Sequence, residues 1–352
     1  MPMTDSAILE RWLTLVAPEW WERATPATGA TWARKERAME PERLRSRPYQ
    51  AGDQRNVVEL LLSAQAAEPG FDWPGAGQLR ALLADPALDH ARCACLWEDF
   101  SGALVAFALL RAGGHLLWFT RPSARSDGLD ALIVAWAAQR AGELNASGDA
   151  ISLRTEARSI ETRRLASLER LGFVALPGAS VRLRRSLMDS APAVDASETP
   201  AGYHIRPLAS SELGDYLALA RQLFPHASRL PLSEGRRRAL MADPAYTPGL
   251  DLVAESADGA LVGFCHSALR PDERERLGRR AGWIELLGVA PDHRRAGLAR
   301  ALLRAGLLTL ADYGADSALL TMRADNAYAS ALYAAEGFTP LFEERAYTLT
   351  LE

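Results

Sequence analysis

The sequence carries one domain-sized pattern twice, and this internal repeat constrains the fold more than any other feature. The matches are RP (47–48 and 206–207), RALLADPA with RALMADPA (80–87 and 238–245), GALVAF with GALVGF (102–107 and 259–264), PSARSDGL with PDHRRAGL (122–129 and 291–298) and GF (172–173 and 337–338). They occur in the same order in both halves. Because the period is far longer than the roughly 20–45 residues of a stacked repeat, the sequence predicts two tandem copies of one domain.

The stretch between the copies predicts a linker. Residues 188–201 are rich in Ala, Ser, Pro and Asp and lack apolar periodicity. Copy one is therefore predicted over residues 44–187, and copy two over residues 202–352. Residues 1–43 belong to neither copy. Their segment AILERWLTLV has apolar residues at helical spacing, which predicts an N-terminal helical extension that packs on copy one or, alternatively, docks a partner.

The residue pattern of copy two predicts an alternation of strands and helices. Strands are expected over 203–208, 250–255, 259–269, 281–290, 317–324 and 347–351, and helices over 211–224, 236–242, 297–314 and 326–337. Ala257-Asp258-Gly259 is typical of a hairpin turn. An order in which a helix joins neighbouring strands indicates an α+β layered domain.

A glycine motif follows the strand predicted at 281–290. The run from Arg294 to Ala299, RRAGLA, fits the Q/R-x-x-G-x-G/A signature of the GNAT superfamily of acyl-CoA-dependent N-acyltransferases, and it begins a helix. Asn326, Tyr333 and the Gly-Phe pair at 337–338 resemble that family's second conserved region. The resemblance covers nearly all of copy two, and copy one only in outline. It implies the α+β class, with two tandem GNAT-like domains whose mixed, largely antiparallel sheets are flanked by helices.

The physics of the motif suits an anion. The first N–H groups of a helix lack partners and carry about half a positive charge. Gly297 allows close backbone approach, Ala299 adds little bulk, and Arg294 and Arg295 add positive charge. The alternative is an ordinary strand-to-helix turn with solvated arginines. By resemblance, the anion is the pyrophosphate of coenzyme A, and acetyl-CoA is the expected cofactor.

The family also places the pantetheine arm of the cofactor along the strand before the motif. Here that backbone is Leu287 to Val289, with Gly288 removing side-chain bulk, and the Leu287 N–H is expected to face the thioester oxygen. The predicted cofactor-binding residues are Leu287, Gly288, Val289, Arg294, Arg295, Ala296, Gly297, Leu298, Ala299 and Asn326. Asn326 is also expected to cap its helix.

N-acylation requires a base for the amine and an acid for the departing thiolate. Glu285 shares a strand face with Leu287 and Val289, and it resembles the glutamate that many GNAT enzymes use as base. The alternative is a buried ion pair, to Arg279 or Arg280. Tyr333 matches the tyrosine that protonates the thiolate in the family; the alternative is a packed tyrosine bonded to a backbone carbonyl.

Copy one lacks these groups. Placing Gly128 on Gly297 puts Leu116 at the position of Glu285, and the Gly-Phe match puts Leu168 at the position of Tyr333. Asp127 and Asp130 replace two alanines of the motif. At about 5 Å and an effective dielectric near 20, each carboxylate repels a phosphate charge by roughly 3 kcal/mol. We therefore expect copy one not to catalyse and to bind CoA poorly or not at all, and instead to pack on copy two and shape the acceptor cleft.

Composition argues against several other classes. The formal net charge of −4 gives no support for a nucleic-acid partner or an anionic membrane surface. The three cysteines form neither a disulfide framework nor a metal-type grouping. No N-terminal apolar signal and no run of about 18 apolar residues is present. We expect a cytoplasmic protein without a metal cofactor.

Two functions fit these residues. The first is an acetyl-CoA-dependent N-acetyltransferase acting on a primary amine of a small molecule or a protein; tandem copies with a degenerate first half are similar to double-domain GNAT proteins of the mycothiol synthase type. The second is a non-catalytic acyl-CoA-binding sensor or scaffold. A sensor needs neither Glu285 nor Tyr333, so their presence favours the enzyme.

The acceptor site is expected in the variable loops of copy two. These offer Phe224, His226 and Tyr246, together with the insertion RPDERERLGRR at 270–280, which copy one lacks. The charge of the insertion predicts a solvated hairpin tip. The alternatives are a segment that gates the cleft or one that contacts an acidic substrate.

Overall fold

The computed structural model describes residues 44–68, 74–85, 88–144, 151–188, 199–224, 233–278 and 280–351. The predicted N-terminal extension, most of the predicted linker and His226 lie outside these residues. None of the described helices combines the length and the apolar composition needed to cross a bilayer.

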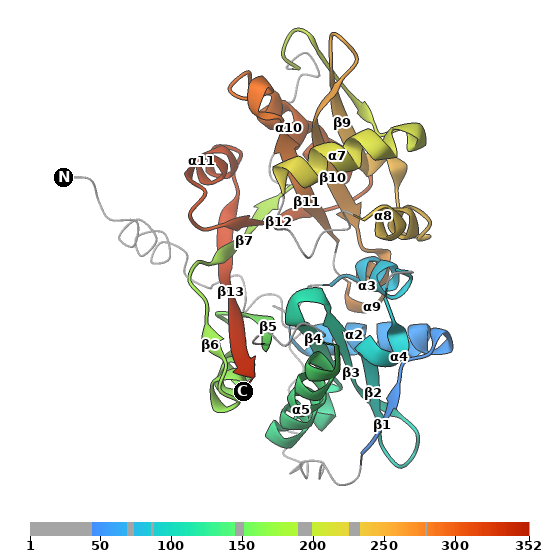
Figure 1. Cartoon of the computed structure of the whole chain (residues 1–352). Helices are drawn as coiled ribbons and strands as arrows, with labels where there is room; N and C mark the ends of the chain where they lie inside the picture. The colour runs from blue at the N-terminus through green and yellow to red at the C-terminus, as the bar shows by residue number, and fades with distance from the viewer. Residues whose placement is uncertain are drawn as a thin grey trace, which may run out of the picture. The chain divides into compact units, whose positions relative to one another are not determined.

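Both copies fold as α+β domains (Figure 1), and copy two has the predicted order of elements with one addition, the helix α9 between β10 and β11. Copy one contains β1 (Arg45–Pro48), α2 (Gln54–Ala67), α3 (Ala76–Leu83), α4 (His90–Cys93), β2 (Ala94–Glu98), β3 (Leu104–Arg111), β4 (His115–Thr120), α5 (Asp127–Leu144), β5 (Ile151–Arg158), α6 (Thr162–Arg170), β6 (Val174–Ala175) and β7 (Ser180–Ser186). Copy two contains β8 (Tyr203–Pro207), α7 (Leu213–Leu223), α8 (Glu234–Met241), β9 (Asp251–Ser256), β10 (Leu261–Leu269), α9 (Pro271–Leu277), β11 (Ala281–Val289), α10 (Leu298–Asp312), β12 (Ser317–Arg323), α11 (Ala327–Ala335) and β13 (Thr339–Leu351). The hairpin predicted at 257–259 joins β9 to β10, and Gly259 has the expected positive φ of 84°. The fold class is therefore confirmed.

The copies exchange their last strands. The described strands form one sheet in the order β1-β2-β3-β4-β5-β13-β7-β12-β11-β10-β9-β8, with β6 beside β13. β7 of copy one pairs with β12 of copy two, from Ser186 opposite Ser317 to Ser180 opposite Arg323. The long strand β13 first pairs with β7 and then continues along β5 and β6 of copy one (Figure 1). Each copy therefore completes its sheet with a strand from the other, and the predicted boundaries at 187 and 202 remain a sequence prediction.

The helix α10 forms the centre of the core of copy two. Its stripe of Leu303, Leu307 and Leu310 is fully buried against the sheet, and each such burial contributes about 1.5–3 kcal/mol. Gly306 lies on the same face, where an added Cβ would stand 2.8 Å from the Cys265 sulfur. The absence of a side chain at that position lets the helix approach the sheet closely, which holds the N-terminus of α10 at a set distance from β11.

Candidate functional site

The strand β11 separates from its neighbour β12 halfway along its length. The two pair in parallel only from Ala281 opposite Ser317 to Ile284 opposite Leu320. Beyond Ile284, β11 continues to pair with β10, while no further partner on the β12 side is recorded in the described part of the sheet. The predicted cofactor-binding backbone, Leu287 to Val289, lies in this separated half. A strand edge of this kind can bind an extended ligand through its backbone.

A β-bulge places Glu285 at the point of separation. His266 of β10 stands opposite Leu286, but the next residue, Ser267, stands opposite Ile284. Glu285 is therefore the extra residue of the bulge. Bulges reorient side chains and occur often beside active sites, so the carboxylate predicted as the base occupies an irregular position in the strand.

The glycine motif forms the turn from β11 into α10. Gly297 is the N-cap of α10 with a φ of 83°, and Arg295 has a positive φ of 63°. Arg294 donates from Nε to the carbonyl of Val289 at 3.0 Å, which joins the turn to the strand. The residues from Arg294 to Gly297 are exposed, whereas the Leu298 side chain is buried. This exposed helix N-terminus, with arginines beside it, fits a pyrophosphate group.

Gly288 has a packing role that the sequence did not indicate. A Cβ at this position would stand 2.8 Å from Leu223 Cδ1, 3.1 Å from Phe264 Cζ and 3.3 Å from Phe224 Cε2. The glycine thus makes room for α7 and its neighbours on that face of the sheet.

Tyr333 and Asn326 lie on α11. The Asn326 side chain accepts from the Ala329 N–H at 3.0 Å, so the predicted N-cap is confirmed. Tyr333 is buried in the cluster that contains Val289 and Leu298, and its ring packs against Phe338 at 5.6 Å. Burial raises the pKa of Tyr333 well above its ordinary value, with a smaller contribution from Cys265. The hydroxyl therefore stays protonated at neutral pH.

Glu285 forms an ion pair, as the alternative interpretation anticipated, but the recorded partner is Arg270. Arg270 donates from Nη2 to Glu285 Oε1 at 3.2 Å, and the Glu285 side chain keeps 13% of its surface exposed. Arg270 also donates to Glu273 at 2.9 Å, and its guanidinium stacks on Trp283 at 3.5 Å from the ring centre.

The prediction of a solvated hairpin tip at 270–280 holds for much of the segment, which joins the antiparallel strands β10 and β11 and exposes Pro271, Arg274 and Glu275, but it is wrong for the first residues. Its first part forms α9, and Arg270 and Glu273 at the start of the insertion are 8% and 2% exposed. Arg270 pairs with Glu273 and Glu285, and Asp272 pairs with Arg80 of copy one. Composition alone does not indicate these partners.

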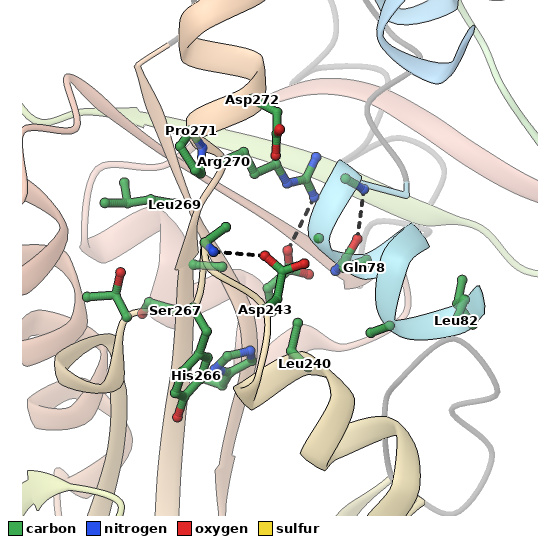
Figure 2. A pocket seen from close by; sticks show the side chains of 18 of the residues that line it. Gln78, Leu82, Leu240, Asp243, His266, Ser267, Leu269, Arg270, Pro271 and Asp272 are labelled. Atoms are coloured by element: carbon green, nitrogen blue, oxygen red, sulfur yellow. Dashed lines mark hydrogen bonds and ion pairs between the residues drawn. The ribbon is translucent and has the colours of Figure 1, made fainter. Parts of the chain in front are cut away.

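A cavity adjoins Glu285, and Figure 2 shows part of its lining. One wall comes from α3 of copy one, and the others come from α8, the end of β10 and the start of α9. Figure 2 shows Gln78 and Leu82 of copy one on the same cavity as Leu240, Asp243 and His266 of copy two. Tyr246, one of the predicted acceptor residues, also lines it, whereas Tyr333 does not. Both copies therefore build the space next to the candidate base.

A buried polar network that the sequence reading missed supports the floor of this cavity. Arg237 and Asp251 form a fully buried ion pair, and the Tyr246 hydroxyl donates to Asp251 at 2.8 Å. Nη1 of Arg237 lies 3.3 Å from His266 Nε2, and His266 Nδ1 lies 3.3 Å from Asp251. Burial would raise the pKa of Asp251, but His266, Arg237 and Tyr246 together lower it to about 2. Residues 236–242 were predicted only as a helix, and nothing local in the sequence pointed to this pair.

The corresponding opening in copy one is largely filled by side chains, which leave a small pocket beside Trp118 and Arg164. β4 and β5 pair only at His115 opposite Arg154. Arg164 enters from α6, stacks on Trp118 at 3.9 Å and donates to the Thr155 hydroxyl at 2.9 Å. Asp130 is buried and accepts from Trp118 Nε1 at 3.2 Å. The expected absence of CoA from copy one remains a prediction, now with space-filling as an additional physical reason beside charge.

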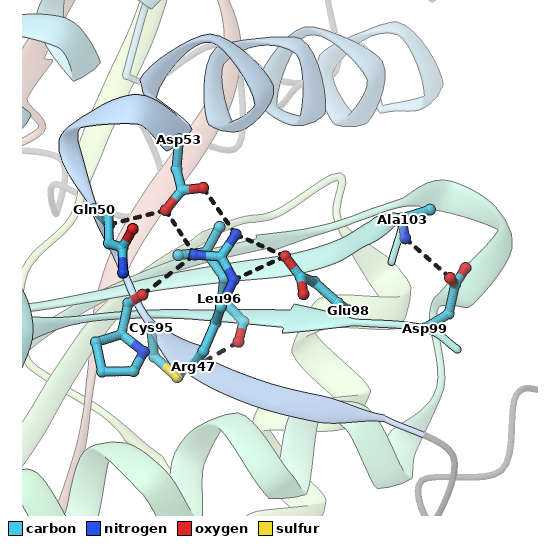
Figure 3. A network of polar contacts seen from close by, with 9 residues as sticks. Arg47, Gln50, Asp53, Cys95, Leu96, Glu98, Asp99 and Ala103 are labelled. Atoms are coloured by element: carbon cyan, nitrogen blue, oxygen red, sulfur yellow. Dashed lines mark hydrogen bonds and ion pairs between the residues drawn. The ribbon is translucent and has the colours of Figure 1, made fainter. Parts of the chain in front are cut away.

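The repeated Arg-Pro pair has a structural role in both copies. Arg47 joins Asp53 and Glu98 in copy one (Figure 3), and Arg206 joins Glu212 and Glu255 in the same way in copy two. The Arg206 side chain lowers the pKa of Glu212 to about 2. The matching networks connect the first strand, the following turn and the next strand of each copy, and they confirm the predicted equivalence of the two halves.

The glycine turn follows β11 and begins α10, as the GNAT signature predicts. Residues 219–338 match the model of the Acetyltransferase (GNAT) family. A mycothiol acetyltransferase of Thermobispora bispora is 30% identical over 297 residues, which are 82% of this chain and 93% of that protein. One of Clavibacter michiganensis is 33% identical over 159 residues, 45% of this chain and 49% of the relative, so this and other matches span about half of the relatives' length.

A solved structure shares the tandem fold. A tandem GNAT protein from the clavulanic acid biosynthesis pathway superposes with a TM-score of 0.62 at 19% identity, over 87% of this chain and 98% of that one. The chain belongs to the GNAT family of acetyltransferases. The acyl donor of these enzymes is acetyl-CoA, and the exposed turn at Gly297 with the separated strand edge fits that cofactor.

Proposed function

We propose that the chain is an acetyl-CoA-dependent N-acetyltransferase whose C-terminal copy, residues 202–352, transfers the acetyl group to a primary amine of a small molecule or a protein. One observation carries this proposal. Glu285 lies at a bulge in β11 and lines the cavity. Further along β11, the edge that is separated from β12 leads to the Gly297 turn. A donor and an acceptor could meet at this carboxylate.

The residues have distinct roles in this proposal. Acetyl-CoA, when bound, supplies the activated thioester. The Glu285 carboxylate accepts the proton that the acceptor ammonium must lose before its nitrogen can attack. The Leu287 N–H stabilises the charge that develops on the carbonyl oxygen. Tyr333, protonated at neutral pH, donates a proton to the thiolate as it departs.

The relatives indicate the first acceptor to test. They are named mycothiol acetyltransferases, so the free amine of a cysteine–sugar conjugate is the first choice for this chain. The cavity offers Gln78, Asp243, Tyr246 and His266 as polar groups among leucines. A protein amino group is the second choice.

The test is release of CoA from acetyl-CoA with a panel of amines that includes the cysteine–sugar conjugate. We expect turnover by the wild type and a loss of about 100-fold or more in kcat for Glu285→Gln and for Tyr333→Phe, with CoA affinity retained. Tight binding of acetyl-CoA without turnover on any amine would instead support the sensor or scaffold function.

A further inference from the structure

The guanidinium of Arg270 is enclosed on several sides at the start of α9. Glu285 and Glu273 accept from it at 3.2 and 2.9 Å, and Trp283 stacks against it. At Glu285, the Nη2 of Arg270 donates to Oε1. A carboxylate fixed through one oxygen has a defined orientation and can present the other to an incoming amine.

The backbone of copy one provides a further wall around Arg270. A Cβ added at Gly75 would stand 2.7 Å from Arg270 Nε and 2.9 Å from its Cδ. The φ of Gly75 is −71° and its ψ is 162°, a conformation that any residue adopts. Backbone geometry therefore does not require glycine at this position, whereas the position of the Arg270 side chain does.

Copy one also contacts the helix that follows Arg270. Arg80 of α3 donates to Asp243 at 2.5 Å and to Asp272 at 2.9 Å. Asp243 follows α8, and Asp272 is in the first turn of α9. Gly75 therefore lies against the Arg270 side chain, and Arg80 binds α9, the helix that follows Arg270.

We propose that copy one is a working part of the catalytic centre: through Gly75 and Arg80 it fixes Arg270, and Arg270 acts as a positioning residue that orients the Glu285 carboxylate toward the acceptor amine. This inference rests on the proposed role of Glu285 as the base. It accounts for the insertion at 270–280 in copy two alone, since copy one has Leu116 at the position of Glu285 and has no carboxylate to orient.

Full-length Gly75→Ala tests the contact from copy one, with Gly52→Ala as its control. Gly52 lies in the same copy, outside the cavity, and a Cβ there would meet nothing within 4 Å. We expect Gly75→Ala to lower kcat by about 10-fold or more, because displacement of a catalytic group by about 1 Å can cost 100-fold, with little change in the KM for acetyl-CoA or in melting temperature. Gly52→Ala should retain wild-type kinetics.

Variants of Arg270 provide a second measurement that does not depend on Gly75. Arg270→Lys keeps a cation near Glu285 and should recover part of the kcat that Arg270→Met loses, while CoA binding stays the same in both. Wild-type kcat in Gly75→Ala, or equal kcat in the lysine and methionine variants, would overturn the positioning role. Wild-type activity in Glu285→Gln would overturn the proposed base itself, so the two failures are distinguishable.

Discussion

The exchange of terminal strands makes a strong prediction about fragments of this chain. Copy two as predicted from sequence, residues 202–352, lacks β7, the strand that lies between β12 and β13 in the sheet. Val181, Leu183 and Leu187, contributed from before residue 188, are buried in the core of copy two. Arg182 between them stacks on Trp283 at 4.5 Å. The fragment therefore loses part of its core as well as a strand.

The size of this loss can be estimated. At about 1.5–3 kcal/mol for each buried side chain, the three apolar residues account for roughly 5–9 kcal/mol. The total stability of a domain is about 5–15 kcal/mol. We therefore expect residues 202–352 to be unfolded, and residues 178–352, which retain β7, to fold.

The assay is thermal unfolding followed by circular dichroism, with CoA binding measured by calorimetry. Both fragments lack β5, so the comparison isolates β7. We expect a cooperative transition and CoA binding only for residues 178–352. Equal melting temperatures and equal CoA affinity in the two fragments would refute the reasoning that β7 belongs to the core of copy two.

Further predictions concern the cofactor turn, the buried network and copy one. Arg295→Ala should weaken CoA binding by about 3- to 10-fold in calorimetry, less at high salt because exposed charges are screened; no change would argue against an anion at this turn. Asp251→Asn should lower the unfolding free energy by about 3–5 kcal/mol in denaturant titration, because Arg237 would stay buried without its counter-charge. The pKa of Asp251 is lowered to about 2 in the folded chain. The ionised carboxylate therefore stabilises the folded state at pH values above its unfolded pKa of about 4, and this stabilisation is lost as the pH falls toward 2. A wild-type acid-unfolding profile in Asp251→Asn would contradict this. Calorimetry of the wild type should give one CoA per chain, because Arg164 and Trp118 largely fill the opening in copy one; two equivalent sites would show that this opening is accessible.

The position of the cofactor turn was predictable because its signals are local. Gly297 follows a short apolar strand and precedes an amphipathic helix, so the turn and the helix start follow from neighbouring residues. The N-cap at Asn326 was predictable for the same reason. Glu285 was noticeable as a charge in an apolar strand, but its bulge was not, since a bulge depends on the register of β10.

The partners of Glu285 could not be predicted. Arg270 stands fifteen residues away and belongs to a segment whose composition indicates solvent exposure. Its burial depends on Gly75 of the other copy, almost two hundred residues earlier in the sequence. Charged residues become buried only when the folded chain supplies their counter-charges, and those counter-charges are distant in sequence.

The amino-acid sequence by itself determined that this chain contains one α+β domain twice, with a GNAT turn in the second copy and mismatched residues in the first. These features depend on periodicity, glycines and residue types within short segments. Only the tertiary structure decided which copy each final strand joins, because strands of the same alternating pattern satisfy either partner equally well. The tertiary structure likewise brought α3 of copy one to the cavity beside Glu285, since contacts between distant segments are selected by the packing of the whole domain.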